Sequence, residues 1–301
     1  MEEEVLQLSA SKIKLVHQCF GKYYYRYIIK IPFIQTIWPG TIFGTIIHKI
    51  LEEVMLNKKD KMSDEDILEK VNNRFEAEFL HQLDNIKKDK NKVFKKSMDY
   101  REDTFLKKGE KTALSISKFV LKYYGHEIYD INPELIMESN WEYTPNVFIK
   151  GVADLPLHTS KIEYKIVDFK TTKDSNNFYF IYWPTDIQSL VYLYLCYKKF
   201  GTFATGFEYL VCNHEEKNMF INSKYFIELP KTKEEIKKFF EPLDIEINNI
   251  IDMIKKPKEE YWNPTVDNCG FCEFSRWCKL SKSIRKDNQY EKEYIKGNEI
   301  K

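Results

Sequence analysis

Apolar positions recur at helical spacing in two segments near the start of the chain. The first segment, residues 8–30, opens with Ser9 and Ser11, either of which can cap a helix, and places Cys19 in its final turns. The second segment covers residues 41–56. Its apolar stripe consists of Phe43, Ile46, Ile47, Ile50, Leu51 and Val54. Prolines and a glycine stand between the segments, so we expect two helices joined by a short connection.

The chain from residue 57 to about residue 125 is polar, rich in lysine and free of proline. Ser63 followed by three acidic residues is typical of a capped helix start, and residues 113–124 continue the helical pattern. We therefore predict a helical insertion here. Within it, residues 86–108 contain nine Lys or Arg against four Asp or Glu, which favours a solvated helix face over a nucleic-acid contact surface.

Alternating and apolar runs in the second half of the chain predict further strands and helices. Three strands are expected over residues 135–143, 147–155 and 164–170, joined by turns as one antiparallel meander. After them we expect a helix over 186–200, strands over 206–211 and 218–229, and a long amphipathic helix over 233–256. Elements in this order are typical of a layered α/β protein.

Composition narrows the class of protein. With 43% hydrophobic residues, 20 Tyr and 21 Phe, the 301-residue chain has the apolar side chains that a folded core requires. Its charges nearly balance at net +1, so any affinity for nucleic acid must come from local basic patches. The N-terminus is acidic, unlike a signal peptide, and no apolar run reaches the ~20 residues needed to cross a membrane. We expect a cytoplasmic protein with no membrane partner.

Six cysteines in a reducing compartment point to metal ligation or buried thiols in preference to disulfides. Two of them, Cys196 and Cys212, stand in apolar runs and are expected in the core. The other four are Cys19 and the C-x2-C-x5-C run of Cys269, Cys272 and Cys278. A compact thiolate triplet completed by one distant thiolate implies that the two ends of the chain meet at one inorganic centre.

Two carboxylates and an amine come together on the predicted strands. Asp168 and Lys170 are two residues apart on one strand, so both side chains face the same side while Phe169 faces the core. Asp154 lies on the neighbouring strand. The two carboxylates suit a hard divalent cation, and the ammonium can orient a water or stabilise charge that develops on a phosphate.

Two predicted helices add polar side chains at a spacing of four residues. Gln188 and Tyr192 share one helix face, where an amide and a phenol can reach a phosphate or a metal-bound water. His48 and Glu52 share a face of the otherwise apolar helix over 41–56. An imidazole there would add a nitrogen ligand, which favours tolerance of Mn²⁺ beside Mg²⁺.

The order of these residues resembles the RecB-like branch of the PD-(D/E)XK nucleases, in particular its iron–sulfur members, which include the CRISPR-adaptation exonucleases and the AddB nuclease domain. The motifs that carry the resemblance are Cys19, Gly44-x3-His48, Gly151-x2-Asp154, Val167-Asp168-Phe169-Lys170, Gln188-x3-Tyr192 and C-x2-C-x5-C. The resemblance implies a restriction-endonuclease-like α/β fold: a mixed sheet core flanked by helices, with a helical insertion and an iron–sulfur clasp that joins the N- and C-terminal segments.

On this basis we divide the chain into six segments. They are an N-terminal helix with the first cluster cysteine (1–36), a core helix with His48 (37–56), a helical insertion (57–130), the nuclease core (131–230), a C-terminal helix with the cysteine cluster (231–280) and a polar tail (281–301). We expect the tail to be loosely ordered, because it is polar and terminal.

The resemblance also implies a role for each site residue. The implied ligands of a catalytic Mg²⁺ or Mn²⁺ are His48, Asp154, Asp168 and the backbone carbonyl of Phe169. Lys170 would activate or position the attacking water, and Gln188 and Tyr192 would complete the site. Glu138, on the first strand, is expected to assist.

For Cys19, Cys269, Cys272 and Cys278 the resemblance implies a 4Fe-4S cluster. Zinc sites usually pair two short knuckles, whereas three local cysteines and one remote cysteine suit a cluster with four thiolate corners. Closing a loop of this length restricts the unfolded chain, so we expect a structural role for the cluster and leave a redox role open.

The leading interpretation is a metal-dependent DNA exonuclease that hydrolyses phosphodiester bonds and prefers single-stranded DNA or DNA ends. One alternative is a catalytically silent nucleic-acid-binding or scaffold module that keeps the fold. Another is the nuclease subunit of a helicase–nuclease complex. Because the chain has no G-x-x-x-x-G-K-S/T loop, the helicase would then be a separate partner.

Overall fold

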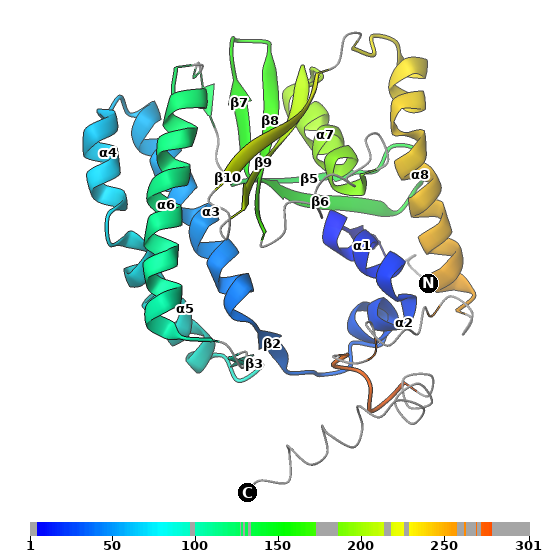
Figure 1. Ribbon diagram of the computed structural model, residues 1–301. Coiled ribbons are helices and arrows are strands. Elements are labelled where there is room, and N and C mark those ends of the chain that lie inside the picture. Colours follow the sequence, from blue (N-terminus) through cyan, green and yellow to red (C-terminus); the bar gives the residue numbers. More distant parts are fainter. Residues whose placement is uncertain are drawn as a thin grey trace, which may run out of the picture.

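The computed structural model describes the fold over most of the chain (Figure 1). The described residues are 5–96, 100–126, 128, 130–131, 134–172, 186–213, 218–225, 229–257, 262, 269 and 272–278. The predicted polar tail, residues 281–301, lies outside them. Within the described ranges, no helix combines the length and the apolar character that crossing a membrane requires.

The described strands form two main sheets. The first contains β1 (Leu6–Leu8), β6 (Val147–Ala153) and β5 (Leu135–Asn140) in that order, with β1 parallel and β5 antiparallel to β6. The second contains, in order, β10 (Asn218–Tyr225), β9 (Gly206–Asn213), β8 (Tyr164–Thr172), β7 (Leu155–His158) and β4 (Asp130–Ile131). In this sheet β8 and β9 run parallel and the other neighbours antiparallel. Elsewhere β2 (Gln35–Ile37) pairs with β3 (Lys92–Phe94).

The predicted antiparallel meander of three strands is wrong, because the chain changes sheets in its middle. β6 ends at Ala153 and β7 begins at Leu155, so Asp154 alone separates a strand of the first sheet from a strand of the second. Leu155 pairs with Val167, and the same register continued would pair Ala153 with Phe169. Instead β6 turns away, and the backbone N–H of Phe169 donates to Asp154 Oδ2 at 2.7 Å. Alternation predicts strands but not their partners.

Helices cover the sheets from two sides (Figure 1). On one side α1 (Ala10–Gln18), α7 (Ile187–Phe200) and α8 (Lys233–Lys255) share a core with the first sheet. On the other side α3 (Pro39–Lys59), α4 (Asp64–Val71), α5 (Arg74–Lys88) and α6 (Glu102–Tyr124) share a second core with the second sheet. β8 contributes Tyr164 and Ile166 to the first core and Val167 and Phe169 to the second, as its period of two requires.

Two of the six cysteines belong to these cores. Cys196 of α7 is fully buried in the first core, and Cys212 of β9 is buried in the second. Burial raises the pKa of both thiols, to about 11 at Cys212. The prediction that these two cysteines lie in the core is confirmed.

The residues predicted as a helical insertion fold as helices that pack on the second sheet and on α3. Ser63 caps α4 as expected, since its Oγ accepts the backbone N–H of Asp66 at 3.1 Å. Tyr124, the last residue of α6, donates to the buried Glu208 of β9 at 2.9 Å. Lys165 Nζ of β8 lies 3.5 Å from the same carboxylate. A buried polar contact thus ties the end of α6 to the central strands.

The single helix predicted over residues 8–30 is interrupted at Cys19. Ser9 caps α1 as predicted, because its Oγ accepts the backbone N–H three residues on at 3.3 Å. Cys19 then adopts an extended backbone, and α2 (Phe20–Tyr23) and a π-helical turn (Tyr24–Ile28) follow. After the break α2 packs closely on Trp262, since a Cβ on Gly21 would lie only 2.7 Å from Trp262 Cδ2. The interruption brings α2 against the C-terminal segment.

The N-terminal segment meets the C-terminal segment at α2 and the turn after it, as the cysteine spacing predicts. Glu273 Oε2 lies 3.2 Å from Lys22 Nζ, and the same carboxylate pairs with Arg26. The ring of Tyr25 packs on that of Phe274, with their centroids 5.8 Å apart. Arg26 and Glu273 are 247 positions apart in the sequence, so these contacts enclose almost the whole fold.

Candidate active site

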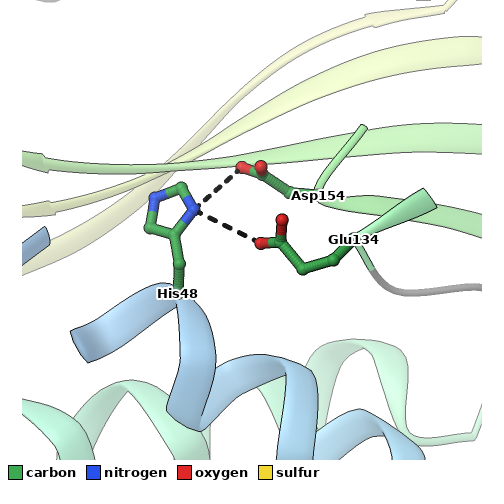
Figure 2. Close-up of side chains that lie close together, drawn as sticks. All are labelled: His48, Glu134 and Asp154. Carbon is green, nitrogen blue, oxygen red and sulfur yellow. Dashed lines mark ion pairs between the residues drawn. The ribbon is translucent and has the colours of Figure 1, made fainter. Parts of the chain in front are cut away.

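Three side chains from different parts of the chain converge at the break between the two sheets (Figure 2). His48 Nδ1 lies 3.5 Å from Asp154 Oδ2 and 3.8 Å from Glu134 Oε1. Their ligand atoms all lie within 4.8 Å of one another, and no other group of three His, Cys, Asp or Glu side chains in the described ranges is as close. One nitrogen and two carboxylates are donors that Mg²⁺ and Mn²⁺ accept. The group could therefore hold a divalent cation.

A glycine one turn earlier brings His48 into this position. The apolar stripe of α3 packs on the second sheet, and a Cβ on Gly44 would lie 3.3 Å from Thr171 Oγ1 near the end of β8. Glycine therefore lets the helix lie close to the strand. One turn later the imidazole of His48 stands edge-on to the ring of Phe169, with centroids 6.0 Å apart. The Gly44-x3-His48 motif thus sets an imidazole beside β8.

The predicted residues of β8 and α7 form a second group. Asp168 is fully buried, its Oδ1 accepts a hydrogen bond from Gln188 Nε2 at 2.8 Å, and its Oδ2 pairs with Lys170. Gln188 Nε2 also lies 3.3 Å from the hydroxyl oxygen of Tyr192. Gly151 of β6 allows this approach, because a Cβ there would lie 3.2 Å from Tyr192 Cε1. Both oxygens of Asp168 therefore have partners.

Burial and charge shift the pKa values of the three central groups. Burial raises the pKa of the Asp168 carboxyl to about 6, although Lys170 acts in the opposite direction. Burial also acts to raise the pKa of Asp154, but the hydrogen bond and charge of His48, with Lys170 and the N–H of Phe169, together outweigh it and lower the pKa. At His48 burial acts to lower the pKa, and the carboxylates of Asp154 and Glu134 outweigh it and raise the pKa to about 10. Without a bound cation, the imidazolium therefore balances these carboxylates near neutral pH.

Glu134 belongs to none of the motifs in the sequence, which predicts Glu138 as the assisting carboxylate. Glu134 has a left-handed backbone, with φ 50°, directly before β5, and its N–H donates to the carbonyl of Asp154 at 2.8 Å. This turn lets its carboxylate reach His48. Glu138 is exposed on β5, opposite Lys150 of β6. An acidic residue at the start of a strand becomes informative only when that strand is known to pair with β6.

The four cysteines of the predicted clasp are contributed by both ends of the chain. Cys269 is buried, whereas Cys19, Cys272 and Cys278 are partly exposed. Burial raises the pKa of the Cys272 thiol, and the nearby charges of Glu273 and Cys19 add to the rise. Among the described residues, no three cysteine sulfurs lie within 4.8 Å of one another. Four thiolates are nevertheless the donor set of a 4Fe-4S cluster, in which each thiolate binds a different iron.

The chain matches the PD-(D/E)XK nuclease superfamily over residues 7–279. The protein therefore belongs to the PD-(D/E)XK nuclease superfamily. Its mixed sheets with helices on both sides confirm the predicted restriction-endonuclease-like fold class. Membership makes the protein a nuclease and implies DNA as its substrate, and nucleases of this superfamily usually use Mg²⁺ or Mn²⁺.

Two solved structures are similar to the chain at low sequence identity. A provisionally assigned exonuclease from Eubacterium rectale shares 12% identity at a TM-score of 0.45, and the match covers 81% of this chain and 80% of that chain. The protein SSO0001 shares 12% identity at a TM-score of 0.33, and the match covers 89% of this chain and 97% of that chain. No curated protein matches this chain at a significant level. The assignment rests on the superfamily match.

Binding of Mn²⁺ to the DNA-free protein should become stronger as the pH rises. A cation must displace the proton of His48, whose pKa is raised to about 10, and at acidic pH also the proton of Asp168, whose pKa is about 6. Affinity should increase about tenfold per pH unit near neutrality, where one proton is released, and more steeply in acid. Calorimetric titration in buffers of different ionisation enthalpy measures the released protons. Affinity that is independent of pH would contradict this site.

Glu134→Gln should weaken Mn²⁺ binding about tenfold or more, because it removes one of the two carboxylates that contact His48. Glu138→Gln is the matched control, since it makes the same change at an exposed position four residues away. Titration of both variants with Mn²⁺, together with their melting temperatures, separates loss of a ligand from loss of the fold. Equal affinities in the two variants would remove Glu134 from the cation site.

Proposed function

We propose that the chain is a metal-dependent DNA exonuclease of the RecB-like branch, which hydrolyses phosphodiester bonds in single-stranded DNA or at DNA ends. The observation that carries this proposal is the arrangement where the two sheets separate: His48 pairs with Asp154, which binds the N–H of Phe169, and the flanking Asp168 and Lys170 pair with each other. Buried ionisable groups with shifted pKa values, gathered at one place, are typical of functional sites. The preference for single strands or ends is carried over from the iron–sulfur nucleases that the motifs resemble.

The residues fit a catalytic Mg²⁺ or Mn²⁺. The resemblance assigns the ion to His48, Asp154, Asp168 and the backbone carbonyl of Phe169. Of these, His48 and Asp154 form, with Glu134, the group of close ligand atoms. Hard cations take carboxylate and carbonyl oxygens, and Mn²⁺ also accepts a ring nitrogen. When bound, the ion would supply Lewis-acid chemistry at the phosphate. His48 would reach the ion from α3, and Asp154 and Asp168 would reach it from where the two sheets separate.

Lys170 is the residue that we expect to handle the attacking water. Its ammonium pairs with Asp168 and lies 5.5 Å from the ring centroid of Tyr209, so a carboxylate and an aromatic face hold it. From there Lys170 can donate to a water and to the phosphate oxygen on which negative charge develops. Gln188 holds the second oxygen of Asp168, with Tyr192 next to it. These contacts fix the orientation of the Asp168 carboxylate, which is the proposed metal ligand.

With Mg²⁺ or Mn²⁺ the protein should shorten end-labelled DNA progressively, and single strands faster than duplexes. Asp168→Asn and Lys170→Ala should each lower the rate about 100-fold or more, because each removes a group that acts in the hydrolytic step. Digestion of oligonucleotides labelled at one end, resolved by length against time, measures both the rate and the direction.

Lys150→Ala is the matched control for Lys170→Ala, because Lys150 is an exposed lysine on β6. It should retain the activity of the unchanged protein. Undiminished cleavage by Asp168→Asn or Lys170→Ala would overturn the assignment of the active site. DNA binding without any cleavage by the unchanged protein would instead favour the catalytically silent module.

We infer that Cys19, Cys269, Cys272 and Cys278 bind a 4Fe-4S cluster with a structural role. The four-thiolate donor set supports this proposal, and so do the contacts of Lys22 and Arg26 with Glu273, which bring together the segments that carry these cysteines. Cys19 terminates α1, and the other three cysteines follow α8 in the sequence. A cluster here would close a loop of most of the chain, which restricts the unfolded state.

Protein purified without oxygen should be brown and contain about four iron atoms per chain. Cys272→Ser should lose colour and iron and melt at a lower temperature. Cys196→Ala, which changes a buried cysteine of the first core, should keep its colour and iron. Absorption spectra and metal analysis read out both variants. Colourless protein with one zinc per chain would overturn the cluster and leave the nuclease proposal intact.

A further inference from the structure

The side-chain amide of Gln188 lies between two charged groups of opposite sign. Lys14 Nζ of α1 donates to Gln188 Oε1 at 2.7 Å, and Gln188 Nε2 donates to Asp168 Oδ1 at 2.8 Å. A lysine can only donate and a carboxylate can only accept, so a single orientation of the amide satisfies both. The opposite orientation would set the amide oxygen against the carboxylate and the NH₂ group against the ammonium.

Lys14 is itself held in place by α7. Its Nζ lies 3.6 Å from Oδ1 of Asp186, which caps this helix by accepting the backbone N–H groups of Gln188 and Ser189. The hydroxyl of Tyr209 donates to the same carboxylate. The ammonium therefore has one hydrogen-bond acceptor and one ion-pair partner at the start of α7, although the side chain remains 44% exposed.

We propose that Lys14 is a positioning residue of the nuclease site that acts through Gln188, an inference that rests on the proposed function. Asp168 has to turn one oxygen toward a cation while the other stays on Gln188, so the amide sets the plane of the carboxylate. The positive charge of Lys14, hydrogen-bonded to Oε1, polarises the amide of Gln188 and makes its NH₂ group a stronger donor. Without Lys14, one end of the amide loses its charged partner, and the carboxylate loses alignment. The loss of Lys14 should therefore lower the rate of the chemical step.

A half-exposed lysine beside a nuclease site could instead contact a DNA phosphate directly. The two roles differ in what they predict. A phosphate contact contributes to DNA affinity and to its salt dependence, whereas a positioning residue contributes to kcat. The hydrogen bond to Gln188 and the ion pair with Asp186 engage the ammonium within the protein, which favours the positioning role.

A double-mutant cycle on kcat tests the proposal, with Lys14→Met, Gln188→Ala and the two combined. Lys14→Met should lower kcat about tenfold and leave KM for a single-stranded oligonucleotide unchanged. Lys14→Arg keeps a charged donor and should recover most of the loss. In the Gln188→Ala background, Lys14→Met should have no further effect, because the residue through which it acts is absent. The slope of log KM against log salt should not change.

Lys12→Met is the matched control on the same helix, because within the described part of the chain the Lys12 ammonium contacts the carbonyl of Gln7 and the ring of Tyr27 and no residue of the site. It should leave kcat unchanged. An equal loss in Lys12→Met, or independent effects of Lys14→Met and Gln188→Ala, would overturn the positioning role. So would a higher KM with a salt slope reduced by about one, which would assign Lys14 to a phosphate.

Asp168→Asn separates this inference from the proposed function. If Asp168→Asn is inactive while Lys14→Met is fully active, the nuclease site stands and Lys14 has no role in positioning it. If Asp168→Asn retains activity, the site itself is wrong and the inference falls with it. If both variants lose activity, and the effects of Lys14→Met and Gln188→Ala are non-additive, the result supports both the nuclease site and the positioning role of Lys14.

Discussion

The hydrogen bond from the backbone N–H of Phe169 to Asp154 Oδ2, 2.7 Å long, is the contact on which the site depends. It forms where the first sheet turns away from β8 and leaves a buried backbone donor without a strand partner. Such a donor must be satisfied, so the Asp154 carboxylate is fixed at the junction of the sheets. His48 reaches it from α3 and Glu134 from the turn before β5. Separating the two sheets thus creates the space for the site and places its first carboxylate.

Charge balance organises the rest of the site. The protonated His48 stands against Asp154 and Glu134, and the ammonium of Lys170 stands against Asp168. Internal cations thus offset the buried carboxylates when no divalent ion is bound, which keeps the cost of burying them tolerable. The same carboxylates become available to an ion once the imidazolium loses its proton. One set of contacts therefore compensates the carboxylates and gathers the side chains that could hold a divalent ion.

The N-terminal helix lies between the candidate active site and the C-terminal segment that it meets after Cys19. α1 carries Lys14 to Gln188 at the start of α7 and ends at Cys19, where the chain bends toward the C-terminal segment. The contact between Lys14 and Gln188 spans 174 positions, and that between Arg26 and Glu273 spans 247. The contacts between the N- and C-terminal segments therefore help to hold in place a helix that also touches the proposed catalytic residues.

Local chemistry in the sequence determined the helices with their serine caps, the alternation that sets Asp168 and Lys170 on one face of β8, and the buried Cys196 and Cys212. These features depend on neighbours a few residues away, which spacing reveals. Only the tertiary structure decided the change of sheets at Asp154, the approach of Glu134 to His48, the break of the first helix at Cys19 and the contact of Lys14 with Gln188. Each of these requires segments far apart in the chain to meet, and the pairing of distant strands and helices leaves no periodic trace in either segment alone.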